Sequence, residues 1–146
     1  MAIERRAEVV WEGPLASGSG EAKGASSNAF SLPVTWSART EAADGMTSPE
    51  ELIAAAHASC YAMAFSNVLA EAGSPPDRLE VAAVVSAELD DDGLRVTTSD
   101  LTVTGRVPGF EASDFSRHAQ DAERACPVSN ALRGNVEIRV EARLED

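Results

Sequence analysis

Two cysteines, Cys60 and Cys126, are the side chains in this 146-residue sequence best suited to redox chemistry. The ordinary pKa of a thiol is about 8.5, so a reactive cysteine needs a neighbour that favours its anion. A second thiol close enough to condense with an oxidised first thiol would allow a peroxidase cycle. Both cysteines lie among apolar residues, where a cysteine is often an inert small side chain. The two cysteines could therefore be catalytic or inert, and residue type alone does not decide between these.

Arg39 is the only basic residue between Lys23 and Arg78, a window that contains Cys60. A guanidinium favours a nearby thiolate and can donate hydrogen bonds to peroxide oxygens as charge develops on the leaving group. Glu50 could hold Arg39 through a bidentate pair. The alternative for Arg39 is a solvated surface arginine. The alternative for Glu50 is an acidic residue that only interacts favourably with the positive end of a helix dipole.

Spacing limits how these residues can act together. Glu50 and Cys60 are ten positions apart, which is about 15 Å along one helix. One Arg39 can hardly bond Glu50 and also activate Cys60 of the same helix. If all three cooperate, we infer that a second subunit supplies the Arg39–Glu50 pair, which predicts an active site at a dimer interface.

Two histidines are further candidates. His57 precedes Cys60 by one helical turn and His118 precedes Cys126 by two, so each could be a base or a metal ligand. A core histidine with satisfied hydrogen bonds is the more common case. The four residues could form a Cys2His2 zinc site, although their spacings match no zinc-finger or zinc-ribbon pattern.

A central helix over Ser48–Gly73 must position Cys60. Ser48 is a good N-cap, Pro49 suits the first helical position, and Glu51 predicts a capping box. Gly73 and the prolines at 75 and 76 end the helix. No charge occurs from residue 52 to 70, which predicts a helix buried on every face, against sheets or a subunit interface. Its polar interruptions and acidic flanks disfavour a membrane span.

The rest of the chain predicts strands on both sides of this helix. Residues 3–12 and 29–39 read as strands, with Arg39 at the end of the second, and residues 13–28 as a loop or weak hairpin arm. Residues 79–89 and 94–107 form a hairpin, and residues 135–144 a closing strand. A second helix is expected from Ser113 to Cys126, followed by a short turn over 127–132. The order predicts one α+β domain, residues 1–146, with antiparallel sheets packed around the long helix plus a second helix.

The net charge of −12 would repel nucleic acid and anionic membranes, so we expect neither as a partner. The first twelve residues carry scattered charges and no apolar stretch, so no signal peptide is expected. Two cysteines in such a chain argue against a structural disulfide framework. We expect a cytoplasmic protein.

Two motifs resemble a known superfamily. Residues 47–64, TSPEELIAAAHASCYAMA, and residues 125–129, ACPVS, are similar to the two cysteine motifs of the osmotically inducible protein C (OsmC) and organic hydroperoxide resistance (Ohr) superfamily. The likeness extends from residue 5 to the closing strand. In the Ohr type the arginine stands in the early glycine-rich loop, but residues 13–37 contain none. The OsmC type carries it just before the helix, where Arg39 stands, so the chain resembles the OsmC type.

The resemblance implies an intertwined α+β homodimer with two active sites at its interface, acting as a thiol peroxidase on organic hydroperoxides. It makes Cys60 the peroxidatic thiol, Cys126 the resolving thiol, and Glu50 the carboxylate that orients Arg39. It also implies an intramolecular disulfide that an external dithiol, such as a lipoyl group, reduces. No cofactor and no metal are expected. The alternative is a non-catalytic small-ligand or metal-binding dimer with inert thiols.

Overall fold

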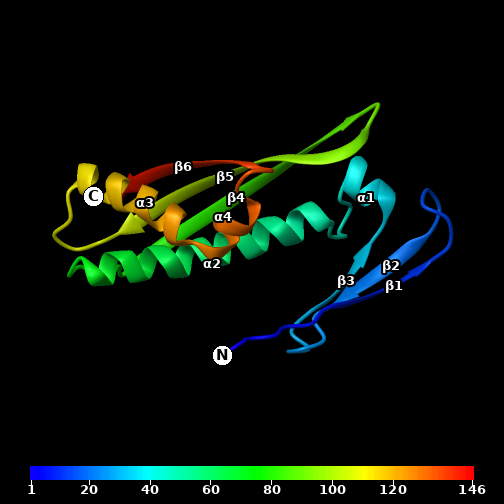
Figure 1. Ribbon diagram of the computed structural model, residues 1–146, viewed down its shortest axis with the longest axis horizontal. Coiled ribbons are helices and arrows are strands. Elements are labelled where there is room, and N and C mark those ends of the chain that lie inside the picture. Colours follow the sequence, from blue (N-terminus) through cyan, green and yellow to red (C-terminus); the bar gives the residue numbers. More distant parts are fainter. The chain divides into compact units, whose positions relative to one another are not determined.

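The computed structural model describes all residues 1–146 and divides them into two compact units, Met1–Leu52 and Ile53–Asp146 (Figure 1). The long helix α2 (Pro49–Glu71) begins in the first unit and continues through the second. Each unit contains its own three-stranded sheet. Helices and separate sheets of this kind confirm the expected α+β class.

The first unit is a meander of three short antiparallel strands, β1 (Glu8–Glu12), β2 (Ser19–Lys23) and β3 (Ser31–Val34), followed by the short helix α1 (Trp36–Thr40). The alternation of side chains gives this sheet one apolar face, which includes Val9, Trp11 and Leu32. Val9 is 60% exposed and Trp11 39% exposed, so this face is largely uncovered in the single chain.

The strand expected over residues 29–39 is wrong in its second half. It ends at Val34, and Arg39 lies in α1 instead. Thr35 is the reason, because its hydroxyl oxygen accepts a hydrogen bond from the backbone N–H of Ala38 at 3.1 Å and caps a helix there. The opening strand is also shorter than expected, and the region 13–28 contains the hairpin arm β2.

Helix α2 starts where the sequence predicts. Ser48 accepts a hydrogen bond from the N–H of Glu51 at 3.1 Å, as an N-cap should. The capping box is not completed, because the Glu51 carboxylate accepts from the Thr47 hydroxyl at 2.8 Å. Gly73 adopts a φ of +88°, the left-handed conformation that ends helices and that glycine adopts without strain.

The second unit has strands β4 (Arg78–Asp90), β5 (Gly93–Arg106) and β6 (Glu137–Leu144), with helices α3 (Ala112–Ala125) and α4 (Pro127–Leu132) between the last two. β5 is the central strand and pairs antiparallel with β4. It pairs parallel with β6, so the expectation of purely antiparallel sheets is wrong for this strand. The helical crossover returns the chain to the level of Thr98 in β5 before β6 begins, and a parallel pair requires such a crossover.

Helix α3 begins at Ala112, after Glu111, which makes no side-chain capping bond. The N-cap expected at Ser113 is therefore wrong by two positions. The helix ends at Ala125 because Pro127 cannot continue it. Cys126 is left in an extended conformation between α3 and α4, with φ −75° and ψ 116°.

The core of the second unit lies on one face of its sheet. Helix α2 contributes Tyr61, Phe65 and Leu69, which are fully buried and four residues apart. They pack in one cluster with Leu101, Val103, Val107, Phe115, Ala119, Ala122 and Cys126. Gly105 belongs to the same face of β5, and a Cβ atom there would lie 2.5 Å from the ring of Phe115. The glycine therefore lets α3 approach the strand.

Only one stripe of α2 is buried in the single chain, so the expectation of burial on every face is not met there. The buried residues are His57, Tyr61, Phe65 and Leu69, whereas Met63 is 69% exposed. By length and composition alone α2 could cross a membrane, but its aromatic stripe packs into a protein core. The rest of α2 is made mostly of small or apolar residues, and these are partly or fully exposed in the single chain.

Candidate active site

The two cysteines, 66 positions apart in sequence, meet in the second unit. Both are free thiols; Cys60 is partly exposed on α2, and Cys126 is fully buried at the start of α4. The Cys126 thiol is close enough to Cys60 to raise its pKa. The fold thus places a reachable thiol beside a sheltered one, as a peroxidatic and resolving pair requires.

The turn that carries Cys126 directs backbone N–H groups towards both sulfurs. Pro127 occupies the first position of α4, and Cys126 is its N-cap. The Cys126 Sγ accepts a hydrogen bond from the N–H of Ser129 at 3.5 Å. The N–H of Val128 lies close enough to the Cys60 thiol to lower its pKa. The start of one short helix therefore supports a partial negative charge on either sulfur.

Within this unit the Cys60 thiol is not activated. Burial raises the pKa of Cys60 above its ordinary value, and the neighbouring Cys126 thiol raises it further. The nearby Val128 N–H opposes both effects. No cation contributes, so a group that lowers the pKa of Cys60 has to come from elsewhere.

A small pocket gives access to Cys60. Its volume is about 440 Å³, and its lining is mostly apolar. The residues that line it are Ser59, Cys60, Met63, Ala64, Asn67, Ala125 and Pro127. Met63 and Ala64 are apolar neighbours one turn from the thiol, so an organic group could bind there beside it.

His57 is buried between two serines. Its Nδ1 lies 2.6 Å from the Ser99 hydroxyl on β5, and its Nε2 lies 2.7 Å from the Ser129 hydroxyl on α4. Burial lowers the pKa of His57, and the negative charge of Glu123 partly offsets this. Burial therefore favours the neutral form of the ring, and His57 is a core histidine with both nitrogens bonded. The serines were not foreseen, because a single serine carries no signal of its partner.

Two other buried polar residues lie where helices α2, α3 and α4 meet. Glu123 is 8% exposed and pairs with Arg133 at 2.8 Å. The Tyr61 hydroxyl donates to the carbonyl of Ala119 at 2.9 Å, and burial strongly raises the pKa of Tyr61. These contacts join the end of α3 to α2 and to α4.

Arg39 and Glu50 form a bidentate pair in the first unit. Arg39 Nε donates to both carboxylate oxygens at 3.0 and 3.1 Å, and Nη2 donates to one of them at 2.8 Å. The carboxylate is only 12% exposed and the arginine 31% exposed. A shielded fork of this kind fixes the direction of the guanidinium and leaves its remaining donors free for another group.

The positions of the side chains do not support the hypothesis of a Cys2His2 zinc site. No group of three or more histidine, cysteine, aspartate or glutamate side chains is arranged to hold a metal. Both nitrogens of His57 are used by serines, and His118 Nδ1 donates to the carbonyl of Asp114 at 2.7 Å. His118 also packs edge-on against Phe110.

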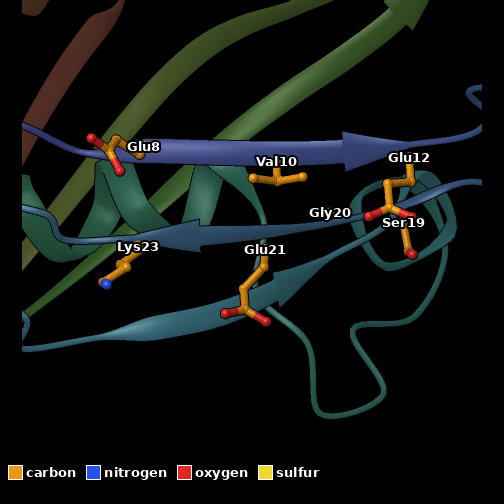
Figure 2. Close-up of a pocket in the computed structure, with 7 residues that line it drawn as sticks. All are labelled: Glu8, Val10, Glu12, Ser19, Gly20, Glu21 and Lys23. Atoms are coloured by element: carbon orange, nitrogen blue, oxygen red, sulfur yellow. The ribbon is translucent and has the colours of Figure 1, made fainter.

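A second hollow, of about 430 Å³, lies in the first unit on the polar face of β1 and β2 (Figure 2). Its side chains are mainly charged, and the charged residues are Glu8, Glu12, Glu21 and Lys23. Figure 2 shows these residues and Val10 on two adjacent strands. It contains no cysteine and none of the site residues expected from the sequence.

The fold and the paired thiols define a class: an α+β protein with a partly exposed helix cysteine beside a second, buried cysteine at a helix N-terminus. The family model described as OsmC-like protein matches residues 42–141. The chain therefore belongs to the OsmC-like protein family.

Comparison with relatives agrees with this assignment. The chain is 37% identical over 138 residues to peroxiredoxin OsmC of Escherichia coli (strain K12), covering 94% of this chain and 96% of that protein. It is 29% identical over 119 residues to organic hydroperoxide resistance protein-like 1 of Staphylococcus saprophyticus, and the match covers 81% of this chain and 83% of that protein. The higher identity to the first agrees with the expected OsmC type.

Among solved structures, the organic hydroperoxide resistance protein OhrB of Bacillus subtilis has a similar fold. The TM-score is 0.72 at 24% identity, and the match covers 94% of this chain and 98% of that chain. This similarity agrees with the architecture described above for each unit.

Proposed function

We propose that the chain reduces organic hydroperoxides to alcohols with Cys60 as the peroxidatic thiol and Cys126 as the resolving thiol. It is a cysteine-based peroxidase with a role in hydroperoxide defence, as its relationship to peroxiredoxin OsmC and the hydroperoxide resistance proteins indicates. The observation that carries the assignment of roles is the position of Cys60, which borders an apolar pocket while Cys126 lies buried beside it.

In the first step, the Cys60 thiolate attacks the distal oxygen of the hydroperoxide. The O–O bond breaks, the sulfur keeps the distal oxygen as a sulfenate, and the alkoxide takes a proton to leave as the alcohol. Met63 and Ala64 favour a substrate with an organic group, because they present apolar surface next to the sulfur.

In the second step, the Cys60 sulfenic acid condenses with the Cys126 thiol. An S–S bond forms, and one water leaves with the sulfenic oxygen. An external dithiol then reduces the disulfide and is itself oxidised to a disulfide. A lipoyl-type dithiol is the reductant we propose. The cycle uses no cofactor, metal, nucleic acid or membrane.

Activation of Cys60 requires a second copy of the chain. The pKa of Cys60 is raised within its own unit, and Glu50 holds Arg39 about 15 Å along α2 from Cys60. A homodimer in which each chain presents Arg39 to the other's Cys60 would lower that pKa. The uncovered faces of α2 and of the β1–β3 sheet provide apolar surface for such a dimer.

The experiment is intact-mass measurement after one equivalent of an organic hydroperoxide, followed by peptide mapping. A loss of about 2 Da with a linked Cys60–Cys126 peptide is expected, because a sulfenic acid that condenses with a thiol ends as a disulfide. An unchanged mass with both thiols free would contradict the proposal and favour a binding protein.

A further inference from the structure

His57 contacts the elements that carry both thiols, and the peroxidase cycle above gives it no role. It stands on α2 three positions before Cys60, and its Nε2 bonds Ser129, which stands three positions after Cys126. Its Nδ1 bonds Ser99 of the central strand. All three side chains are fully buried.

The two hydrogen bonds fix the imidazole in one orientation. A neutral imidazole has one N–H donor and one acceptor nitrogen, so one serine donates to the ring and the other accepts from it. Neither serine hydroxyl has access to water that could replace its bond, since both residues are fully buried. Loss of either bond leaves a buried polar group unpaired.

Ser129 links this ring directly to the resolving cysteine. Its hydroxyl bonds His57, and its backbone N–H bonds the Cys126 sulfur. The backbone N–H of the residue before Ser129, Val128, lies close enough to the Cys60 thiol to lower its pKa. Cys126 itself has an extended backbone between two helices, so neither helix fixes its side chain by regular structure.

We propose that His57 is a positioning residue for disulfide formation: through Ser129 it holds the Cys126–Ser129 turn so that the Cys126 thiol faces Cys60. This inference rests on the proposed function and deepens it. His57 touches neither thiol nor substrate in this role. It keeps the resolving thiol in reach of the sulfenic acid formed on its own helix.

Two serine variants separate positioning from general stability. Ser129→Ala removes the hydroxyl that links His57 to the Cys126 turn. Ser99→Ala removes an equally buried hydroxyl from the other side of the same ring and leaves the Ser129 link intact. The pair is therefore matched in chemistry and burial but not in its connection to Cys126.

The measurement is a single turnover with one equivalent of an organic hydroperoxide such as cumene hydroperoxide. Hydroperoxide loss reports the first step, and quenched samples analysed by intact mass report the disulfide. We expect Ser129→Ala to form the disulfide at least about tenfold more slowly, because a displacement of about 1 Å can slow a reaction on the order of 100-fold. Hydroperoxide loss should be little changed, and Ser99→Ala should resolve at close to the wild-type rate.

Two His57 variants test the same link without altering the serines. In His57→Gln the side-chain amide reaches towards the place of Nε2 and can keep a bond to Ser129. In His57→Asn the shorter amide reaches only towards the place of Nδ1 and Ser99. We expect His57→Gln to restore most of the resolving rate and His57→Asn to accumulate over-oxidised Cys60.

Equal resolving rates in Ser129→Ala and Ser99→Ala would overturn the inference, whether both are fast or both are slow. If either serine variant fails to fold, equal rates in the two His57 variants would overturn it in the same way. These outcomes leave the proposed function standing, because the wild-type protein still forms the disulfide. A wild-type protein that forms no disulfide would overturn the proposed function itself.

Discussion

At the scale of single residues, each cysteine has an environment suited to one half of a thiol cycle. Cys60 borders a pocket, and Cys126 is enclosed and caps a helix with its sulfur. The difference in exposure matters because the first thiol must meet a substrate, while the second must meet only the first. We therefore expect the roles proposed for them not to be interchangeable.

Serine substitutions should expose this difference. Cys60→Ser is expected to abolish turnover, because Cys126 has no access to substrate. Cys126→Ser should consume one equivalent of hydroperoxide rapidly and then gain further oxygen atoms at Cys60, since its sulfenic acid lacks a partner. Turnover assays with intact mass distinguish the two variants. Full activity in Cys60→Ser would exclude Cys60 as the peroxidatic residue.

The buried His57 predicts a loss of stability in acid. Burial lowers the pKa of His57 below its ordinary value of 6.5, while the unfolded chain has that ordinary value. As the pH falls below 6.5, His57 binds a proton in the unfolded state but not yet in the folded state. The free energy of unfolding therefore decreases. The decrease continues until the pH reaches the lowered pKa of the folded state.

His57→Gln should remove this part of the pH dependence. Denaturant unfolding of the wild-type protein and the variant on both sides of pH 6.5 measures it. We expect the wild-type protein to lose more stability than the variant as the pH falls, even if the variant is less stable at neutral pH. Parallel curves would mean that His57 does not contribute to acid sensitivity.

At the scale of elements, the approach of α3 to β5 depends on one glycine. A methyl group at position 105 would lie 2.5 to 2.6 Å from the ring of the fully buried Phe115. Because the ring belongs to a packed aromatic cluster, it cannot simply turn away. This contact sets how closely α3 can lie against the strand.

Gly105→Ala is therefore expected to lower the free energy of unfolding by about 1–3 kcal/mol, the usual range for an overpacked core. Adding Phe115→Leu removes the atoms that clash, so the double variant should lose less stability than the two single losses combined. Thermal or denaturant unfolding of the four proteins completes the cycle. Additive losses would show that the glycine acts through something other than this contact.

At the scale of the whole molecule, the proposed activation of Cys60 by Arg39 depends on which chain supplies the arginine. The pair with Glu50 fixes Arg39 at the start of α2, and Cys60 lies ten residues further along the same helix. A homodimer with shared sites answers the question if each site takes its arginine from the other chain. A chain that lacks Arg39 and a chain that lacks Cys60 should then restore activity when they form a mixed dimer.

Co-refolding Arg39→Ala with Cys60→Ser tests this arrangement. Each variant alone should be nearly inactive, and the mixture should recover up to about a quarter of the wild-type activity. Random pairing makes about half of the dimers mixed, and each mixed dimer has one complete site. In Arg39→Ala the pKa of Cys60, followed by thiolate absorbance, should rise. A mixture no more active than its components would place each site within one chain.

Local signals made several features predictable from the sequence. Ser48 and Gly73 marked both ends of α2, and the turn before residue 93 marked the long hairpin. His57 was expected to be a core histidine with satisfied bonds, and its two serine contacts agree with this. In each case the signal lies within a few residues of the feature.

Other features depend on partners that no short stretch of sequence identifies. Trp36 continued an alternating pattern and was assigned to a strand, although Thr35 could have indicated the helix start. The parallel direction of β6 follows from the crossover, not from its own residues. The contacts of Ser99 and Ser129 with one imidazole join segments 42 and 72 positions from His57, and the roles of the four site residues stay predictions.

The parallel pairing of β6 also sets an order of assembly. Thr98 pairs with Glu137, 39 positions later, whereas the β4–β5 hairpin closes over a few residues at its turn. Closing the longer loop costs more chain entropy, so the hairpin should form early and β6 should dock last. A nascent chain would then expose one edge of β5 until translation passes β6, and pulsed hydrogen exchange should find β6 amides protected after those of β4. During that interval the edge is open to strands of other chains.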